Sequence, residues 1–197
     1  MYRFWNNNVG GLPKVFAILL NVLYKSLYEK ISSFFWKFNL CECGLNVIIQ
    51  KGTVIRMPSR IQLNDNVSIG RDCQISSEFQ DSYLMIGKNT KIDKNCLLDY
   101  SGGLRIGHNV TLSEGVMIET HSHGYNPRSI PAKRPLEIMD NVWIGAHTII
   151  LPNVKIIGKN VIIGAGSVVT KSIEESCIVA GNPAKVLKTN NKDFINE

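Results

Sequence analysis

Charged residues are scarce in this sequence, at 19% of its 197 residues. A disordered chain is rich in charge and poor in β-branched residues, so the composition excludes one. Isoleucine (24 residues) and asparagine (19) are abundant instead. Both form helices less readily than alanine, leucine or glutamate, which disfavours a helical bundle. The length is typical of one compact domain with a short appendage.

Long apolar runs and paired cysteine motifs are also missing. The apolar run 15–23 is interrupted by Asn21, and a membrane-spanning helix needs about 20 apolar residues. No small-residue cleavage site follows it, so we expect no signal peptide. The five cysteines form no CxxC pair, which favours reduced thiols in the cytoplasm over a disulfide framework. The net charge of +6 is small and scattered, so we expect no nucleic acid partner.

A six-residue repeat organises residues 49–173. An aliphatic residue begins each of 17 hexads, and Val, Thr, Ser or Cys stands at the fifth position of 14 of them. Asn occupies the fourth position seven times, and its tolerance of left-handed backbone suits a corner there. Each hexad would form one short strand and one turn, and three hexads would close a coil. The repeat therefore predicts a prism of nearly six coils, stacked about 4.8 Å apart.

The repeat stops at residues 119–137 and resumes afterwards. This segment, ETHSHGYNPRSIPAKRPLE, contains three prolines. Proline cannot donate to a β ladder, so we expect the segment to leave the prism as a loop. Long loops in compact proteins are often functional.

The flanking regions, residues 1–48 and 174–197, are expected to form the ends of the molecule. Residues 12–40 predict one or two amphipathic helices, and the tail after Pro183 predicts a short C-terminal helix. Two interpretations of the N-terminal helices stay open. They cap the unpaired strand edges of the first coil, or their apolar residues and lysines lie at the inner face of a membrane.

The sequence resembles the hexapeptide-repeat acyltransferases, in the branch that acetylates maltose, galactosides and polysaccharides. The resemblance runs over residues 44–188 and rests on the repeat and on the segments LLDYSGGLRIGHNVTLSEGVMIETHSHGYNP, DNVWIGAHTII, IIGAGSVVTK and VAGNPAKVLK. It implies a left-handed parallel β-helix and a homotrimer. It also implies transfer of acetyl from acetyl-CoA to a sugar hydroxyl without a metal, in capsule, O-antigen or exopolysaccharide assembly.

The resemblance places the catalytic base at His123, with His121 as the second choice. A loop histidine suits this role because its ordinary pKa lies near cellular pH. We expect a second set of residues to orient that histidine or to bind the acceptor: Asp99, Glu119 and Tyr125. The resemblance implies that coenzyme A contacts the late coils and the tail, at Trp143, Ala146, Ala165, Thr170, Lys171, Lys185 and Lys188.

Three other functions stay open. The first is N-acetylation of a nucleotide-linked amino sugar, although 48 residues are too few for the extra N-terminal domain of many such enzymes. The second is a metal hydratase of the gamma-carbonic-anhydrase type, which needs three histidine ligands. The third is a non-catalytic glycan-binding β-helix, which would need neither His123 nor a cationic tail.

Overall fold

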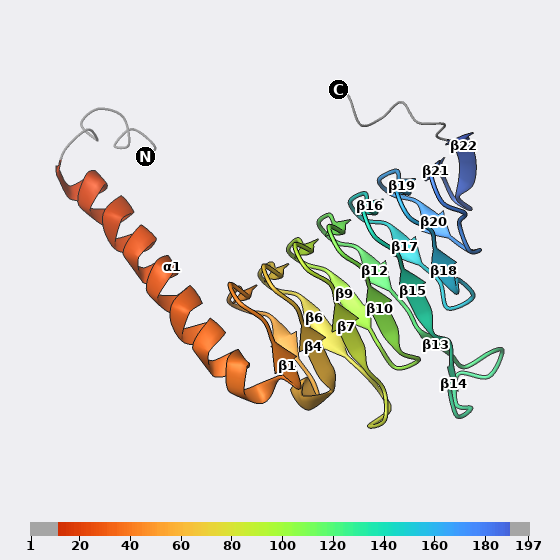
Figure 1. Ribbon diagram of the computed structural model, residues 1–197, viewed down its shortest axis with the longest axis horizontal. Helices are drawn as coiled ribbons and strands as arrows, with labels where there is room; N and C mark the ends of the chain where they lie inside the picture. Colours follow the sequence, from red (N-terminus) through yellow and green to blue (C-terminus); the bar gives the residue numbers. More distant parts are fainter. Residues whose placement is uncertain (1–11, 190–197) are drawn as a thin grey trace, which may run out of the picture.

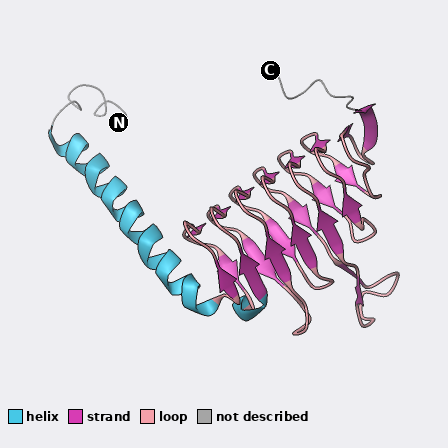
Figure 2. Ribbon diagram, viewed as in Figure 1, coloured by secondary structure: helices cyan, strands magenta, loops and turns pink. Residues whose placement is uncertain are grey.

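The computed structural model describes residues 12–189. Residues 1–11 and 190–197, which belong to the predicted N-terminal segment and C-terminal tail, lie outside the described residues. One helix, α1 (Leu12–Asn39), precedes a prism of short strands (Figures 1 and 2). The prediction of a helix before a repetitive β fold is confirmed.

Three parallel sheets form the sides of the prism. Sheet A contains β1 (Glu42–Cys43), β4 (Ile61–Leu63), β7 (Leu84–Ile86), β10 (Leu104–Ile106), β15 (Leu136–Ile138) and β18 (Ile156–Ile157). Sheet B contains β2 (Ile48–Ile49), β5 (Ser68–Ile69), β8 (Lys91–Ile92), β11 (Thr111–Leu112), β16 (Trp143–Ile144), β19 (Ile162–Ile163), β21 (Cys177–Ala180) and β22 (Lys185–Thr189). Sheet C contains β3 (Val54–Ile55), β6 (Gln74–Ser76), β9 (Leu97–Asp99), β12 (Met117–Ile118), β17 (Ile149–Ile150) and β20 (Val168–Val169).

The chain visits the sheets in the order A, B, C and then begins the next coil. It completes six coils and part of a seventh, as a left-handed β-helix that starts at β1, ahead of the predicted first hexad. Most strands of the prism point an aliphatic residue inward, such as Leu63, Ile69 and Ile75 in the second coil, which are almost fully buried. Burying one such side chain contributes about 1.5–3 kcal/mol, so the stacked aliphatic residues form the core.

The backbone conformation of the corners explains why asparagine recurs at the fourth position of the hexads. Six of the seven fourth-position asparagines have φ between 55° and 60°; Asn153, in a longer corner, is the exception. Along the edge between sheets A and B, the side-chain amide of each corner asparagine donates to the next, at 3.0–3.2 Å. This asparagine ladder consists of Asn46, Asn66, Asn89, Asn109, Asn141 and Asn160.

The edge between sheets C and A carries the long connections. The A–B and B–C corners have four residues in every complete coil, whereas the C–A connections include residues 77–83 and 119–135. Residues 121–133 leave the prism as a hairpin of β13 (His121–Ser122) and β14 (Ala132–Lys133). The segment expected to project as a loop therefore contains a short antiparallel ladder, and its last two residues, 136–137, belong to β15 of the prism.

The two ends of the chain differ from the sequence prediction in detail. Near the C-terminal end of α1, the Ser32 hydroxyl donates to the Ile49 carbonyl (3.0 Å) and Trp36 packs against the core. Upstream of these residues the helix runs away from the coils (Figure 1), so it does not lie across the first coil along its length. Within residues 12–189, no helix has an apolar stretch long enough to cross a bilayer.

The predicted C-terminal helix is wrong for the described part of the tail. Residues 185–189 form β22, which pairs antiparallel with β21. The chain reverses at Gly181, where φ is 103°, and so brings the tail back onto the last strand of sheet B. This pairing satisfies the open edge of β21, a tertiary effect that local composition does not reveal.

Candidate functional site

The histidine hairpin is fixed to the C–A edge at its base. His121 lies opposite Lys133 in the β13–β14 ladder, and the Arg134 amide donates to the Thr120 carbonyl (2.8 Å). The Lys133 ammonium contacts the Asp81 carboxylate (2.5 Å) and lies 4.9 Å from the centroid of the Phe79 ring. The hairpin is therefore tied to the neighbouring connection, residues 77–83.

Asp99 is the most deeply buried carboxylate of this edge, with 5% of its surface exposed. It ends β9, and its Oδ2 accepts hydrogen bonds from the Thr120 amide (2.7 Å) and the Thr120 hydroxyl (2.8 Å). The Ser101 hydroxyl donates to Oδ1 through a short bond. A carboxylate only accepts, so His121 donates from Nδ1 to Oδ2, at 2.9 Å.

These contacts change the proton affinity of both partners. Burial alone would raise the pKa of Asp99, but the hydrogen bonds from Ser101, His121 and Thr120 lower it below its ordinary value. Burial alone would lower the pKa of His121, but the hydrogen bond and charge of Asp99, with Glu78 and Glu119 nearby, raise it. Asp99 is therefore an anion, and His121 takes up a proton more readily than a free histidine.

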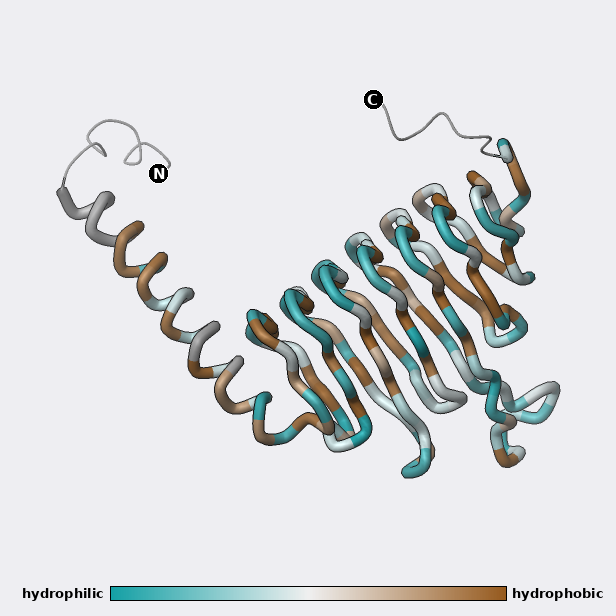
Figure 3. The backbone as a smooth tube through the Cα atoms, in the orientation of Figure 1, coloured by the Kyte–Doolittle hydropathy of each residue, from teal (hydrophilic) through white to brown (hydrophobic). Residues whose placement is uncertain are grey.

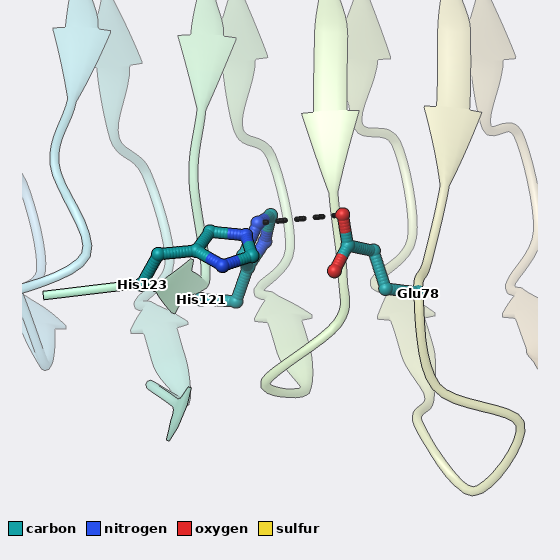
Figure 4. A group of neighbouring side chains, drawn as sticks. All are labelled: Glu78, His121 and His123. Atoms are coloured by element: carbon teal, nitrogen blue, oxygen red, sulfur yellow. Dashed lines mark ion pairs between the residues drawn. The ribbon is translucent and has the colours of Figure 1, made fainter. Parts of the chain in front are cut away.

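His123 is held differently. Its Nδ1 lies 2.9 Å from the Ser129 carbonyl, which can only accept, so in the neutral ring Nδ1 carries the hydrogen and Nε2 carries the lone pair. The Ser129 hydroxyl donates back to the His123 carbonyl (2.7 Å) and closes the tip of the hairpin. The two imidazole rings meet edge to face, with centroids 5.4 Å apart (Figure 4).

Glu78 is a site residue that sequence reasoning missed. It lies on the connection 77–83, and its carboxylate approaches His121 Nε2 to 3.7 Å (Figure 4). The Ser101 hydroxyl accepts from the Glu78 amide (2.8 Å), which fixes the backbone there. The eleven-residue gap between hexads after Ile75 was the available signal, because it marks another long connection at the same edge.

Among the described residues, neither Glu119 nor Tyr125, the other two predicted helpers, forms a hydrogen bond or ion pair with His123. Glu119 directly follows β12 and lies close to Asp99 and His121. Burial and the negative charge of Asp99 raise the pKa of Glu119. Tyr125 is fully exposed in the hairpin. In the single chain, Asp99 orients His121, whereas a backbone carbonyl holds His123.

Two sets of side chains have the spacing of cation ligands. Their ligand atoms lie within 4.8 Å of one another in each set, which are Glu78, His121 and His123, and Asp99, Glu119 and His121. Both sets share His121, whose Nδ1 is already committed to Asp99. One ion pair joins two members of each set, Glu78 with His121 (3.7 Å) and Asp99 with His121 (2.9 Å).

A cleft of about 540 Å³ opens beside the hairpin base. Four of its lining side chains are cationic: Arg105, Lys133, Arg134 and Lys155. Tyr83 and Glu137 also line it. The cleft is suited to an anionic or hydroxyl-rich group.

Known proteins share both the fold and the sequence pattern. The family model described as "Bacterial transferase hexapeptide (six repeats)" matches residues 135–171. A candidate acetyltransferase of Staphylococcus aureus (strain COL) is 36% identical over 140 residues, which cover 68% of this chain and 67% of that protein. This chain belongs to the hexapeptide-repeat transferases.

Other relatives of this hexapeptide-repeat transferase carry sugar-related names. Galactoside O-acetyltransferase of Lactococcus lactis is 34% identical over 64% of this chain, which spans only 65% of that protein. The candidate lipopolysaccharide biosynthesis O-acetyltransferase WbbJ of Escherichia coli K12 is 29% identical, over 74% of this chain and 80% of WbbJ. The crystal structure of AntD, an N-acyltransferase from Bacillus cereus in complex with dTDP and 3-hydroxybutyryl-CoA, matches with a TM-score of 0.72 and 26% identity, covering 81% of this chain and 88% of AntD.

The residues expected to bind coenzyme A fall into three places on the transferase prism. Trp143, Ala146 and Ala165 lie on sheet B and the B–C edge, where the Gly166 amide donates to the Ala146 carbonyl (2.8 Å). Thr170 and Lys171 follow β20 at the C–A edge, and Lys171 lines a hollow of about 360 Å³. The tail lysines, Lys185 and Lys188, lie on β22. Within residues 12–189, none of these groups lines the cleft beside the hairpin base.

Proposed function

We propose that this protein is an acetyl-CoA-dependent O-acetyltransferase acting on a sugar hydroxyl. The observation that carries the proposal is the anchoring of His123 by the Ser129 carbonyl (2.9 Å), which makes Nε2 the basic nitrogen of the neutral ring in the projecting hairpin. An imidazole that is held in place by one ring nitrogen and keeps the other available is suited to general base catalysis. Membership of the hexapeptide-repeat transferases and the names of its relatives support acyl transfer.

The proposed reaction is direct transfer. His123 Nε2 takes the proton of the sugar hydroxyl, the oxygen attacks the thioester carbonyl, and backbone amides near the hairpin stabilise the oxyanion. The carbon–sulfur bond then breaks, and the leaving thiolate receives the proton from His123. His121, paired with buried Asp99 and close to Glu78, is more easily protonated. It would bind and orient the acceptor as a hydrogen-bond donor.

The active form is proposed to be a homotrimer. The outward-facing residues of sheet C are mostly apolar, as expected for a covered face: Val54, Gln74, Leu97, Met117, Ile149 and Val168. If sheet C faces a threefold axis, the C–A edge of each copy meets the B–C edge of the next. The hairpin of one copy would then reach Trp143, Ala146 and Ala165 of its neighbour, and coenzyme A would lie between the prisms.

The acceptor is proposed to be a sugar of capsule, O-antigen or exopolysaccharide assembly, modified in the cytoplasm. The similarity to WbbJ supports this role, because it covers 80% of that protein. The cationic cleft beside the hairpin would take the acidic or phosphate-bearing part of such an acceptor.

The test is release of thiol from acetyl-CoA in the presence of hydroxyl sugars and glycan fragments. We expect His123→Gln to reduce kcat by about a hundredfold or more, because a general base typically contributes that much. His121→Gln should chiefly raise KM. His108→Gln is the matched control, since His108 accepts from the Lys88 amide on the remote A–B edge. Full activity of His123→Gln with loss in His121→Gln would move the base to His121.

A second candidate is N-acylation of a nucleotide-linked amino sugar. Two observations favour it: the similarity to AntD, whose structure contains dTDP, and the four cationic side chains of the cleft. A pyrophosphate would fit such a cleft. Thiol release only with amino-sugar nucleotides, or competition by dTDP against a hydroxyl acceptor, would favour this candidate.

A further inference from the structure

We infer that the outer part of α1 docks the protein on an anionic phospholipid surface. The inference starts from the way the helix meets the prism. Ser32 and Trp36, one turn apart on one face, make the contacts to the first coil. Leu20, Leu27 and Phe34 lie on another face and are 49%, 59% and 67% exposed. The apolar face of α1 is therefore left in water by the single chain.

The exposed apolar surface is broader than one helical stripe. A stripe with heptad spacing runs through Leu20, Tyr24, Leu27, Ile31, Phe34 and Phe38. Outside this stripe, Ile18 and Leu19 are also exposed, at 63% and 54%. A coiled coil with neighbouring copies would bury the stripe alone and leave the flanking residues in water. A lipid surface can accept the stripe and its flanks together.

Polarity changes along the helix in the direction that insertion requires. Asn21 is the only polar residue between 15 and 23, whereas Ser, Lys, Glu and Asn residues are frequent between 25 and 39. The apolar end is the one that runs away from the prism, and hydrophobic residues recur along it in Figure 3. The helix has no stretch fit to cross a bilayer within residues 12–189. Its geometry suits oblique insertion into one leaflet.

The charge of the helix selects the kind of lipid. Its sequence contains four lysines, Lys14, Lys25, Lys30 and Lys37, against one acidic residue, Glu29. Lysines near an anionic surface each add to binding, and this contribution is screened by salt. The partner is therefore a membrane containing anionic phospholipid, such as phosphatidylglycerol.

The test is co-sedimentation of the full chain with vesicles of phosphatidylglycerol and phosphatidylcholine. Leu19→Glu is the diagnostic variant because Leu19 is exposed and lies outside the heptad stripe. Leu45→Glu is the control, since Leu45 is 71% exposed on the prism. We expect Leu19→Glu to weaken vesicle binding at least about tenfold, because a buried leucine contributes more than one tenfold step. Leu45→Glu and wild type should bind alike, and less well to pure phosphatidylcholine.

The mass of the lipid-free protein separates this inference from a helix–helix interface. Leu27→Glu places a charge inside the heptad stripe. If it lowers the oligomeric mass while Leu19→Glu binds vesicles like wild type, a second copy covers the helix and the inference is wrong. Absence of vesicle binding by wild type would also overturn it. Acetyl transfer to a water-soluble acceptor should be unchanged in Leu19→Glu, so a failure of membrane docking is distinguishable from a failure of the proposed activity.

Discussion

Replacing Asp99 by asparagine tests whether the buried carboxylate organises the C–A edge. The substitution preserves the shape of the side chain but removes its charge and turns one acceptor oxygen into a donor. In the protein, Oδ2 accepts from the Thr120 amide and from His121 Nδ1, while Oδ1 accepts from the Ser101 amide (3.2 Å). Whichever way the new amide group is turned, its NH₂ faces a backbone N–H.

The magnitude follows from these contacts. A buried donor left without an acceptor costs about 1–3 kcal/mol, and hydrogen bonds to a charged group contribute about 1.5–3 kcal/mol compared with about 1 kcal/mol for neutral pairs. Removing the buried charge also removes its desolvation penalty, which offsets part of this loss of stability. We expect the free energy of unfolding to fall by about 2–4 kcal/mol, a large share of the roughly 5–15 kcal/mol typical of a domain.

Urea unfolding of Asp99→Asn and wild type at pH 7 and equal protein concentration measures this difference. The pKa of Asp99 is lowered in the folded state, so its stabilisation is present above the unfolded pKa of about 3.9 and is lost as pH falls through the folded value. The difference between the two proteins should therefore shrink in acid. A difference below about 0.5 kcal/mol at pH 7 would refute the reasoning, because surface substitutions have effects of that size.

Three further predictions concern the same edge and the corners. The pKa of His121 is raised in the folded state, so the stability that its protonation contributes is complete below the unfolded pKa of about 6.5 and is lost as pH rises through the folded pKa. In thermal unfolding, His121→Gln should therefore destabilise the protein more at pH 5.5 than at pH 9. Equal destabilisation at both pH values would contradict this. Gly102→Ala would place a Cβ 2.1 Å from the Thr120 carbonyl oxygen and 2.4 Å from the Arg134 amide nitrogen. We therefore expect the free energy of unfolding in urea to fall by about 1–3 kcal/mol and acetyl transfer to fall with it; a stability equal to that of wild type would contradict this. Asn89→Ala should lower the free energy of unfolding in urea by about 1–2 kcal/mol because alanine is strained at a φ of 57°, and Asn89→Gly should recover most of this loss. If the glycine variant is equally unstable, the loss comes from the hydrogen bonds of the asparagine ladder instead.

The prism could be predicted from the sequence because it repeats. An inward aliphatic residue every six positions, as at Ile86, Ile92 and Leu98, is a periodic signal that survives without any knowledge of contacts. The corner asparagines and the projecting segment 119–137 were readable for the same reason, as a regular position and as a break in the period. The break in the repeat also predicts which segment carries the candidate functional residues.

The contacts between the insertions could not be predicted, because they are not periodic. Glu78 and His121 belong to different coils, and the conformations of two separate connections bring their side chains together. Likewise, the sequence favoured a carboxylate to hold His123, whereas the hairpin turn brings the Ser129 carbonyl to it and leaves Asp99 to His121. The β22 strand depends on the open edge of β21, which only the folded prism presents.

The restriction of the long connections to one edge has a consequence for evolution and design. Two edges have corners of constant length, and the asparagine ladder ties one of them together from coil to coil. The C–A edge tolerates connections of different lengths, because each coil restarts with its own inward aliphatic residue. New loops can be grafted there without shifting the register of the stack, so a change of substrate would require changes along a single line of the molecule.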